Sequence, residues 1–448
     1  MVSGEEMRLL HRQYNIAALA PTTDETPAAP GPAARYPIGV SADRRRLVDA
    51  DGKPFLIQGD TAWSLIANLE FEEAVRYLDD RHAKGFNAII VNLIEHHYSE
   101  DPPRDLHGRE PFSRPGDMST ANDAYFDAAV LVLEECAARG ICVILAPAYI
   151  GYRHDRGPGI SLHADGWYDE IVATGVEGCR KYGAYVGRKF GRFANIIWCI
   201  GGDWHPEATR EGLDAIAEGI RAAGVTNLFT GHPHPEFSPI ETFAGSSWLD
   251  LNITYTYGIV HREMLKDWNR NPPWPFFLLE STYEGEHNSS PIQVRRQAYW
   301  SVLCGANGHC VGNHPIWLFG EGWEAALDFP ASKAMVRWGR FFRGVSWHEL
   351  VPDIGHRLVT AGLGEARGLD RVTAAQTADK QIAVVYLPVH RPIEVQLAEM
   401  AGPYVQVEWF EPVSGQTLPG GTLRAAGAAI LTSPFPEDAA LTLKSCAP

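Results

Sequence analysis

Short apolar runs alternate with amphipathic stretches over most of the chain. The runs that predict strands span residues 55–59, 86–93, 141–146, 195–200, 227–231, 250–257, 275–280 and 308–313. They lack the period of two that marks a sheet with one solvated face. We therefore expect strands that are buried on both faces, as in a parallel sheet.

Helical periodicity fills the intervals between these runs. It covers residues 71–84, 123–139, 178–190, 208–222, 259–269, 292–304 and 331–343, and only the connection 232–249 lacks a clean helix. Eight strands with helices between nearly all of them predict an α/β fold, a (β/α)8 TIM barrel, over 37–345. A doubly wound open sheet is the alternative. It lacks support, because "GDTAW" and not Gly-x-Gly-x-x-Gly follows the first run.

The two ends of the chain differ from this pattern. Residues 1–36 are rich in Pro and Ala without periodicity, which is typical of an arm or linker. Residues 346–448 contain short β-type runs such as "IAVVYLPV", broken by Gly and Pro, and no helical periodicity. We expect a small C-terminal all-β sandwich after the barrel.

Charge and cysteine usage narrow the partners and the compartment. The 448 residues carry a formal net charge of −16, which disfavours nucleic acid and anionic membranes as partners. The seven cysteines are odd in number and form no Cys-x-x-Cys pair, as expected for buried free thiols in a reducing compartment. The N-terminus has no signal-peptide pattern, and no apolar stretch is long enough to span a membrane. We expect a cytoplasmic protein, either a monomer or a homo-oligomer.

Polar and aromatic residues gather where the predicted strands end, which is where a barrel carries its active site. In chain order they are Asp60, Trp63, Asn92, His96, Tyr149, Asp203, Trp204, His232, Tyr255, Tyr257, Glu280 and Trp317.

Two carboxylates in this set come from strands that face each other across a closed barrel. "NIIWCIGGDW" carries Asp203 to the end of the fourth strand, and "PFFLLES" carries Glu280 to the end of the seventh. Such a pair suits cleavage of a glycosidic bond, in which one group protonates the leaving oxygen and the other attacks the anomeric carbon or activates water. A separation of about 5–5.5 Å implies retention of configuration, and ~6.5–9.5 Å implies inversion. In the alternative interpretation Asp203 caps a turn and Glu280 pairs with an arginine.

The chain resembles the apiosidase-like glycoside hydrolases, family 140 or domain of unknown function 4038. The resemblance covers most of 37–345 through "LVDADGKPFLIQGDTAW", "GFNAIIVNLI", "NIIWCIGGDWHP" and "FFLLESTYEG". The tail resembles the collagen-binding domain that follows in this family, through "VVYLP" and "VEWFEPVSGQ". The resemblance implies that Asp203 is the acid/base and Glu280 the nucleophile. We expect a retaining exo-glycosidase that releases apiose or another plant-derived sugar from a small oligosaccharide or glycoside, without a cofactor or metal.

The other rim residues are expected to bind substrate. Asp60 is expected to bond sugar hydroxyls or, equally, to cap the following helix. Tyr255 or Tyr257 is expected to donate to the nucleophile, and only one of them is expected to point inward if the strand alternates, unless a bulge intervenes. Trp317 is a candidate floor for the sugar ring, and His232 and Trp204 are rim candidates, as are Trp63, Asn92, His96 and Tyr149.

Two other classes of function remain as alternatives. His96, His97, His232, His234 and His314 would suit a metal-dependent amidohydrolase-like barrel, but that class places His-x-His on its first strand. A non-catalytic carbohydrate-binding protein is the second alternative, and it has no need of two opposed carboxylates.

Overall fold

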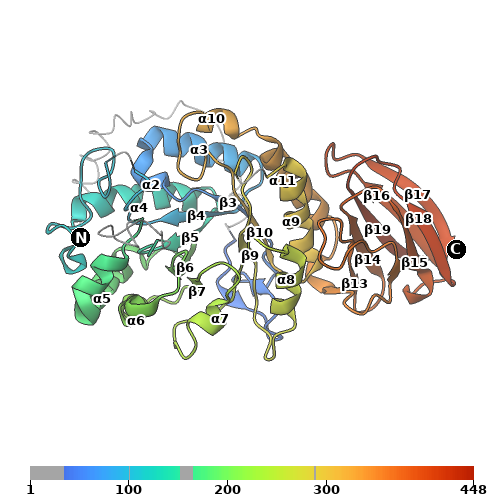
Figure 1. The fold of residues 1–448 in the computed structure, drawn as a ribbon, viewed down its shortest axis with the longest axis horizontal. Helices are drawn as coiled ribbons and strands as arrows, with labels where there is room; N and C mark the ends of the chain where they lie inside the picture. The colour runs from blue at the N-terminus through green and yellow to red at the C-terminus, as the bar shows by residue number, and fades with distance from the viewer. Residues whose placement is uncertain (1–34, 100, 152–164, 287–288, 448) are drawn as a thin grey trace, which may run out of the picture.

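The computed structural model describes residues 35–99, 101–151, 165–286 and 289–447. The arm expected at 1–36 therefore lies almost wholly outside the described residues. Figure 1 shows two units joined end to end, with a helix-covered barrel on one side and an all-β unit, coloured red, on the other.

Eight parallel strands form the barrel sheet, in the order β7-β6-β5-β4-β3-β10-β9-β8. This confirms the predicted (β/α)8 class. The strands are β3 (Ile57–Thr61), β4 (Ala88–Asn92), β5 (Cys142–Ala146), β6 (Ile196–Gly201), β7 (Phe229–His232), β8 (Thr254–Tyr255), β9 (Leu278–Glu280) and β10 (Gly308–Val311).

Helices connect these strands and cover the outside of the barrel (Figure 1). The longer ones are α3 (Phe71–Ala83), α4 (Asp123–Ala138), α5 (Tyr168–Phe190), α6 (Arg210–Ala222), α8 (Val260–Trp268), α9 (Pro291–Leu303) and α11 (Pro330–Arg343). Short turns of helix are α2 (Leu65–Asn68), α7 (Pro239–Thr242), α10 (Trp323–Ala326), η1 (Met118–Thr120), η2 (Glu207–Thr209), η3 (Trp347–Glu349) and η4 (Leu397–Glu399). The connection 232–249, predicted to lack a clean helix, holds only the four-residue α7.

The predicted strands exist, and six of the eight are shorter than their apolar runs. The largest difference is in β8, where only two residues of the run 250–257 form a ladder. Residues before it bond differently: the backbone N–H groups of Asp250 and Leu251 both donate to the carbonyl of Phe229, at 3.0 and 3.2 Å. These bonds join the end strands β7 and β8 and complete the circuit of the barrel.

Apolar side chains fill the barrel interior. Ile57, Ile90, Ile144 and Cys199 belong to one buried cluster, while the alternate residues of their strands face the helices. A hairpin of β1 (Gly39–Val40) and β2 (Leu47–Val48) closes the N-terminal end, where Leu47 joins the same cluster. The open end of the barrel is therefore the end at which the strands finish.

The C-terminal unit consists of two antiparallel sheets, which confirms the predicted all-β module. Their orders are β11-β13-β14-β19-β16-β17 and β12-β15-β18. The strands are β11 (Leu350–Pro352), β12 (Val359–Ala361), β13 (Thr373–Thr377), β14 (Ile382–Leu387), β15 (Pro392–Gln396), β16 (Tyr404–Phe410), β17 (Thr417–Arg424), β18 (Ala428–Thr432) and β19 (Ala439–Cys446).

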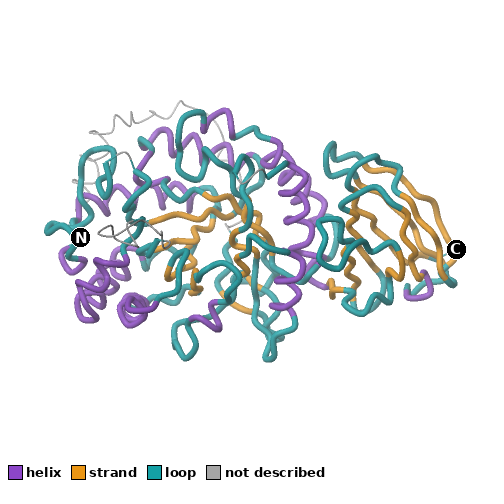
Figure 2. The backbone as a smooth tube through the Cα atoms, viewed as in Figure 1, coloured by secondary structure: helices purple, strands orange, loops and turns teal. Residues whose placement is uncertain are grey.

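The barrel and the sandwich share a hydrophobic core. Figure 2 shows barrel helices lying against the strands of the sandwich. Tyr299 of α9 stacks on Tyr386 of β14, with ring centroids 4.5 Å apart and planes at 7°. Beside them Arg295 forms an ion pair with the fully buried Asp438 (N–O 2.7 Å), which also accepts a bond of 2.8 Å from the Tyr386 hydroxyl. The larger sheet is therefore anchored to the barrel by both apolar and charged contacts.

All seven cysteines are free thiols, and all but Cys446 are buried. Burial raises the pKa of Cys136 to about 12, so this thiol stays protonated at neutral pH. This agrees with the expectation of buried free thiols.

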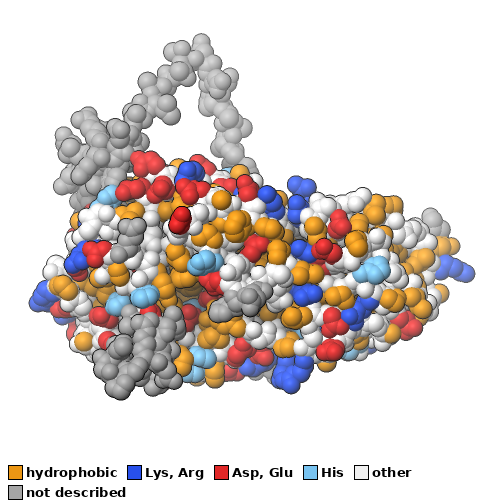
Figure 3. Space-filling view, turned by 45° about the horizontal axis from the view of Figure 1, so that its top comes forward, with side chains coloured by type: hydrophobic (Ala, Val, Ile, Leu, Met, Phe, Trp, Pro, Cys, Tyr) orange, Lys and Arg blue, Asp and Glu red, His pale blue; other side chains and the backbone are white. Residues whose placement is uncertain are grey.

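The surface carries mixed charge. On the face seen in Figure 3, acidic and basic side chains are interspersed among apolar ones, and the coloured atoms form no continuous basic patch there. None of the helices in the described ranges is long and apolar enough to cross a bilayer.

Candidate active site

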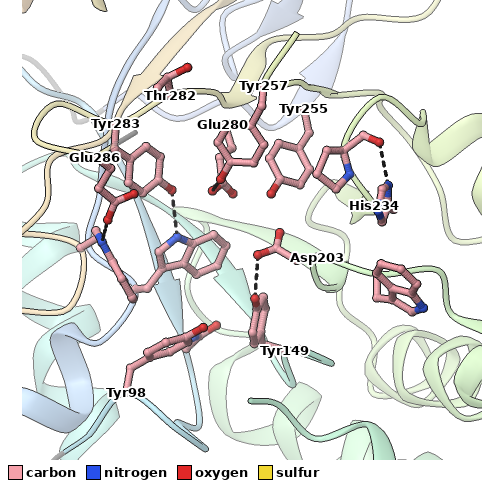
Figure 4. Close-up of a pocket in the computed structure, with 15 residues that line it drawn as sticks. Tyr98, Tyr149, Asp203, His234, Tyr255, Tyr257, Glu280, Thr282, Tyr283 and Glu286 are labelled. Carbon is pink, nitrogen blue, oxygen red and sulfur yellow. Dashed lines mark hydrogen bonds between the residues drawn. The ribbon is translucent and has the colours of Figure 1, made fainter. Parts of the chain in front are cut away.

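A cavity of about 1000 Å³ opens at the end of the barrel where the strands finish. Its lining comes from the ends of all eight strands and the loops that follow them. The lining residues are Trp63, Asn92, Tyr98, Tyr149, Asp203, Trp204, His234, Pro235, Tyr255, Tyr257, Glu280, Thr282, Tyr283, Glu286 and Trp317. Figure 4 shows Asp203 and Glu280 near the middle of this set.

Two glycines explain how Asp203 reaches the cavity. Gly201 has φ +114, and a Cβ there would lie 2.6 Å from the carbonyl oxygen of His232. A Cβ on Gly202 would lie 2.7 Å from the backbone nitrogen of Ile150. The chain thus passes between β5 and β7 only because both residues lack side chains. The turn that follows, with Trp204 N–H donating to Gly202 O at 2.7 Å, puts Asp203 at its apex.

A β-bulge places Glu280. Thr254 pairs with Leu278, but the next residue of β8, Tyr255, pairs with Glu280, so β9 holds one extra residue, Leu279. Strict alternation would turn Glu280 away from the interior that Leu279 faces. The extra residue brings Glu280 to the same side as Tyr255, which is a common use of bulges beside active sites.

His232 lies between the two carboxylates. Its Nε2 is 3.2 Å from Glu280 Oε2 and 3.4 Å from Asp203 Oδ1. A ring nitrogen of His232 and one carboxylate oxygen each of Asp203 and Glu280 all lie within 4.8 Å of one another. The distance between the nearest oxygens of the two carboxylates is therefore 4.8 Å or less. Tyr255 stacks on the His232 ring at 4.9 Å and fixes its plane.

Tyrosine hydroxyls donate to both carboxylates. Tyr149 donates to Asp203 Oδ2 at 2.7 Å, as the dashed line in Figure 4 shows, and Tyr257 donates to Glu280 Oε1 at 3.1 Å. The other Asp203 oxygen, Oδ1, is buried and accepts no hydrogen bond among the described residues. Glu280 thus has donors on both oxygens, and Asp203 has a donor on one.

Burial and mutual repulsion control the protonation of this group. Burial raises the pKa of Glu280, and the charge of Asp203 raises it further, while hydrogen bonds from His232 and Tyr283 oppose the rise. Burial alone would lower the pKa of His232, but the charge of Asp203 and the bond to Glu280 outweigh it and raise that pKa. The charges of Asp203 and His232 thus act on the pKa of Glu280 in opposite directions.

The cavity has two chemically different ends on either side of this pair. Figure 4 shows Tyr98, Tyr283 and Glu286 on one side and His234 on the other. At the first end, Glu286 Oε1 accepts from Trp317 Nε1 at 2.6 Å, and Tyr98 packs edge-on against Trp317 at 4.8 Å.

The second end is an aromatic wall. His234 lies edge-on to Trp204 at 4.7 Å and stacks on His205 at 5.1 Å, with ring planes 9° apart. Phe237, which is 43% exposed, packs against His205 at 4.5 Å. Flat rings therefore continue from the cavity edge towards solvent.

Most of the residues expected from the sequence meet in this cavity. The lining includes Trp63, Asn92, Tyr149, Asp203, Trp204, Tyr255, Tyr257, Glu280 and Trp317. His232 lies just beneath the lining, 2% exposed, where it contacts the two carboxylates and not the open space.

Asp60 and His96 do not line the cavity. Asp60 is 1% exposed, pairs with Arg81 Nε at 2.9 Å and accepts from Tyr77 at 2.9 Å. It faces α3 because its neighbour Gly59 is the residue on the inner side of β3. His96 Nε2 lies 3.1 Å from Glu170 Oε1 of α5, and its ring packs edge-on against Trp167. His96 therefore contacts neighbouring side chains and not the cavity.

The expectation that only one of Tyr255 and Tyr257 points inward needs correction. Both line the cavity. Residues two apart in an extended segment lie on the same face, so alternation itself brings both rings inward. Tyr257 donates to Glu280, while Tyr255 supports His232.

Sequence reasoning missed several lining residues, above all in the loop after β9. Glu284, four residues after Glu280, is buried and accepts a hydrogen bond of 3.1 Å from Asn313. Glu286, two residues later, is the acid that reaches the cavity. Tyr283 also lines it, and accepts a bond of 3.2 Å from Trp63 Nε1. The density of polar residues after Glu280 was the available signal.

The histidines considered as metal ligands do not gather together. His96 and His97 pair with separate carboxylates, Glu170 and Asp165. Within the described ranges, the one cluster whose spacing could hold a cation is Asp203, His232 and Glu280. A metal site would thus coincide with the carboxylate pair and would not use the other histidines.

Comparisons with known proteins match two family models to this chain. The sequence model "Apiosidase-like, catalytic domain" matches residues 41–349, and "Putative collagen-binding domain of a collagenase" matches residues 352–443. No curated protein matches the chain.

Several solved structures share the fold. A glycoside hydrolase has a TM-score of 0.79 and 22% identity, over 92% of this chain and 97% of its own. A glycoside hydrolase family 5 protein from Bacteroides vulgatus also has a TM-score of 0.79 and 22% identity, over 91% of this chain and 93% of its own. A GH30 endoxylanase from Clostridium papyrosolvens has a TM-score of 0.51 and 10% identity, over 87% and 97%.

Proposed function

Because the chain belongs to the apiosidase-like family and is a glycosidase, we propose that it is a retaining, exo-acting enzyme that removes a terminal sugar. The observation that carries the proposal is the opposed pair of carboxylates, Asp203 and Glu280, in one cavity. A binding protein would have no use for two acids forced together at this cost in repulsion.

In the proposed first step, Glu280 attacks the anomeric carbon and forms a glycosyl ester. Asp203 gives its proton to the oxygen of the departing group as the glycosidic bond breaks. In the second step, the Asp203 carboxylate takes a proton from water, the oxygen of that water attacks the anomeric carbon, and Glu280 leaves as a carboxylate.

The hydrogen bonds support this division of roles. Glu280 accepts from Tyr257 and His232, and such donors stabilise an ionised nucleophile. Among the described residues Asp203 accepts a hydrogen bond on one oxygen only, from Tyr149. Its side chain is 20% exposed against 5% for Glu280, so water can reach Asp203 in the second step.

The short approach of the two carboxylates supports retention. An approach within 4.8 Å fits the ~5–5.5 Å typical of retaining enzymes better than the wider gap that admits a water in inverting ones. The family points to apiose or another plant-derived sugar as the terminal residue.

We also propose that the C-terminal sandwich buttresses the barrel and does not bind collagen. The face of its larger sheet that includes Tyr386 is occupied by α9 and α11 of the same chain.

The test is hydrolysis of aryl glycosides and short plant oligosaccharides, with the anomer of the first product followed by NMR. We expect Asp203→Ala and Glu280→Ala to lose at least about 10³-fold in kcat, because each removes a group that acts on the reacting atoms. Azide should rescue both variants, giving a glycosyl azide of retained configuration from Asp203→Ala and of inverted configuration from Glu280→Ala. The surface variants Asp328→Asn and Glu324→Gln serve as matched controls.

Other outcomes would contradict the proposal. A first product of inverted configuration would exclude the covalent step. Activity that persists in both alanine variants but disappears with EDTA would replace the two-carboxylate mechanism with a metal-dependent one.

A further inference from the structure

We propose that Glu286 and Asn92 select an uncharged terminal sugar by accepting hydrogen bonds from its hydroxyl groups, and thereby exclude uronic acids. This inference rests on the proposed glycosidase function and extends it to the class of sugar released.

The position of Asp203 decides which end of the cavity holds this sugar. The acid must reach the oxygen of the departing group, so that group lies on the side of Asp203 and its neighbour Trp204. The aromatic wall of His234 continues on that side. The sugar under attack by Glu280 then lies towards Glu286 and Tyr98, at the opposite end in Figure 4.

Glu286 is held with one oxygen available. Trp317 Nε1 and His314 Nδ1 both bond to Oε1, at 2.6 and 3.1 Å. No described residue donates to Oε2, although the side chain is largely shielded, with 24% exposure. An acceptor fixed in this way can bind a sugar hydroxyl through a charge-assisted bond.

Asn92 is a second acceptor that has no partner among the described residues. It ends β4, is 3% exposed and lines the cavity. Its Oδ1 is buried and accepts no hydrogen bond within the described part of the chain. A buried polar atom without a partner costs free energy, which a hydroxyl donor on the ligand would recover.

Charge makes these acceptors selective. Three carboxyl groups line the cavity, and the described lining contains no lysine or arginine. A uronate would bring a further negative charge into a partly desolvated site, and its carboxylate has no proton to donate to Glu286. A neutral sugar supplies hydroxyl donors without this repulsion, and an amino sugar would be tolerated.

The experiment measures kcat and KM on 4-nitrophenyl glycosides of neutral pentoses and hexoses and on the corresponding glucuronide and galacturonide. We expect the wild type to hydrolyse at least one neutral glycoside and neither uronide. In Glu286→Gln, kcat/KM on that neutral glycoside should fall roughly 10- to 100-fold, mainly through KM, because one charge-assisted bond is weakened. In this variant, the ratio of kcat/KM on the neutral glycoside to kcat/KM on the uronide should fall at least about tenfold.

Asn92→Ala gives an independent arm, with an expected loss of about 3- to 10-fold in kcat/KM on the neutral glycoside. Glu324→Gln, an exposed acid on α10, is the matched control, and thermal midpoints verify that each variant folds. An active wild type that accepts uronides equally, or an unchanged Glu286→Gln, overturns this inference alone. A wild type inactive on every glycoside contradicts the proposed function, and this inference falls with it.

Discussion

His232 is the residue on which the chemistry of the two carboxylates depends. It is buried, it stacks on Tyr255, and its Nε2 lies within 3.4 Å of both Asp203 and Glu280. The bond and the positive charge of His232 lower the pKa of Glu280 and so oppose the effect of burial. The residue acts through Glu280 and does not contact the sugar, so its role is to position and ionise the nucleophile.

Replacing His232 with asparagine should therefore move the pH dependence of the enzyme. Without the imidazole, the pKa of Glu280 rises, and the acidic limb of kcat/KM, which reports ionisation of the nucleophile, shifts to higher pH by about one unit or more. The measurement is the pH profile of kcat/KM on an aryl glycoside. His107→Asn, a change at an exposed histidine paired with Glu70, should leave the limb in place. An acidic limb that stays fixed in His232→Asn would show that His232 does not control the nucleophile.

At the scale of the elements, α5 and α6 approach each other through glycines. A Cβ on Gly183 of α5 would lie 2.1 Å from the carbonyl oxygen of Ile216 on α6. A Cβ on Gly219 of α6 would lie 2.4 Å from the carbonyl oxygen of Arg180. The obstacles are backbone atoms, which cannot rotate away. The two helices support β6, the strand that presents Asp203.

Gly183→Ala should destabilise the protein by about 1–3 kcal/mol, because the added methyl group forces the two helices apart. Denaturant unfolding followed by tryptophan fluorescence measures the change. Arg188→Ala, on the exposed side of the same helix, is the control and should stay within about 0.5 kcal/mol of the wild type. Equal stability of Gly183→Ala and wild type would mean that the helices can separate at little cost.

The elements also show what a sequence can and cannot specify. The apolar runs predicted all eight barrel strands. The positions of Asp203 and Glu280 at the ends of their runs predicted that the two carboxylates meet at the open end of the barrel. Asp60 was misplaced because its direction depends on which residues of β3 face inward, and burial on both faces erases that signal. The bulge at Leu279 also has no signal in the sequence, because it arises from the pairing of β9 with β8. Glu286 lies in a loop, where contacts between distant segments determine direction.

On the scale of the whole molecule, the barrel and the sandwich share one buried core, so we expect them to unfold as one cooperative unit. The face of the sheet that holds β14 and β19 packs on α9 and α11 in a single buried cluster. Asp438 at the centre of this junction has no exposure and pairs with Arg295. The sandwich thus replaces solvent over one side of the barrel.

Arg295→Met should cost about 3–5 kcal/mol, since it leaves the Asp438 carboxylate buried without its cation. Guanidinium unfolding should show one transition in the wild type and a lower midpoint in the variant. The double variant Arg295→Met/Asp438→Leu should recover much of the loss, because no unpaired charge remains. Two separate transitions in the wild type, or no recovery in the double variant, would contradict this account of the junction.

The buried thiols give this molecule a set of internal reporters. Six cysteines lie on α4, β5, α5, β6, α9 with its C-terminal cap, and β10, and so are spread around the barrel. The seventh, Cys446, ends β19 and is partly exposed. On the intact molecule, an alkylating reagent can react with one thiol, that of Cys446. It reacts with a further thiol for each part of the barrel that unfolds. The number of labels acquired over time therefore records the order in which the barrel comes apart.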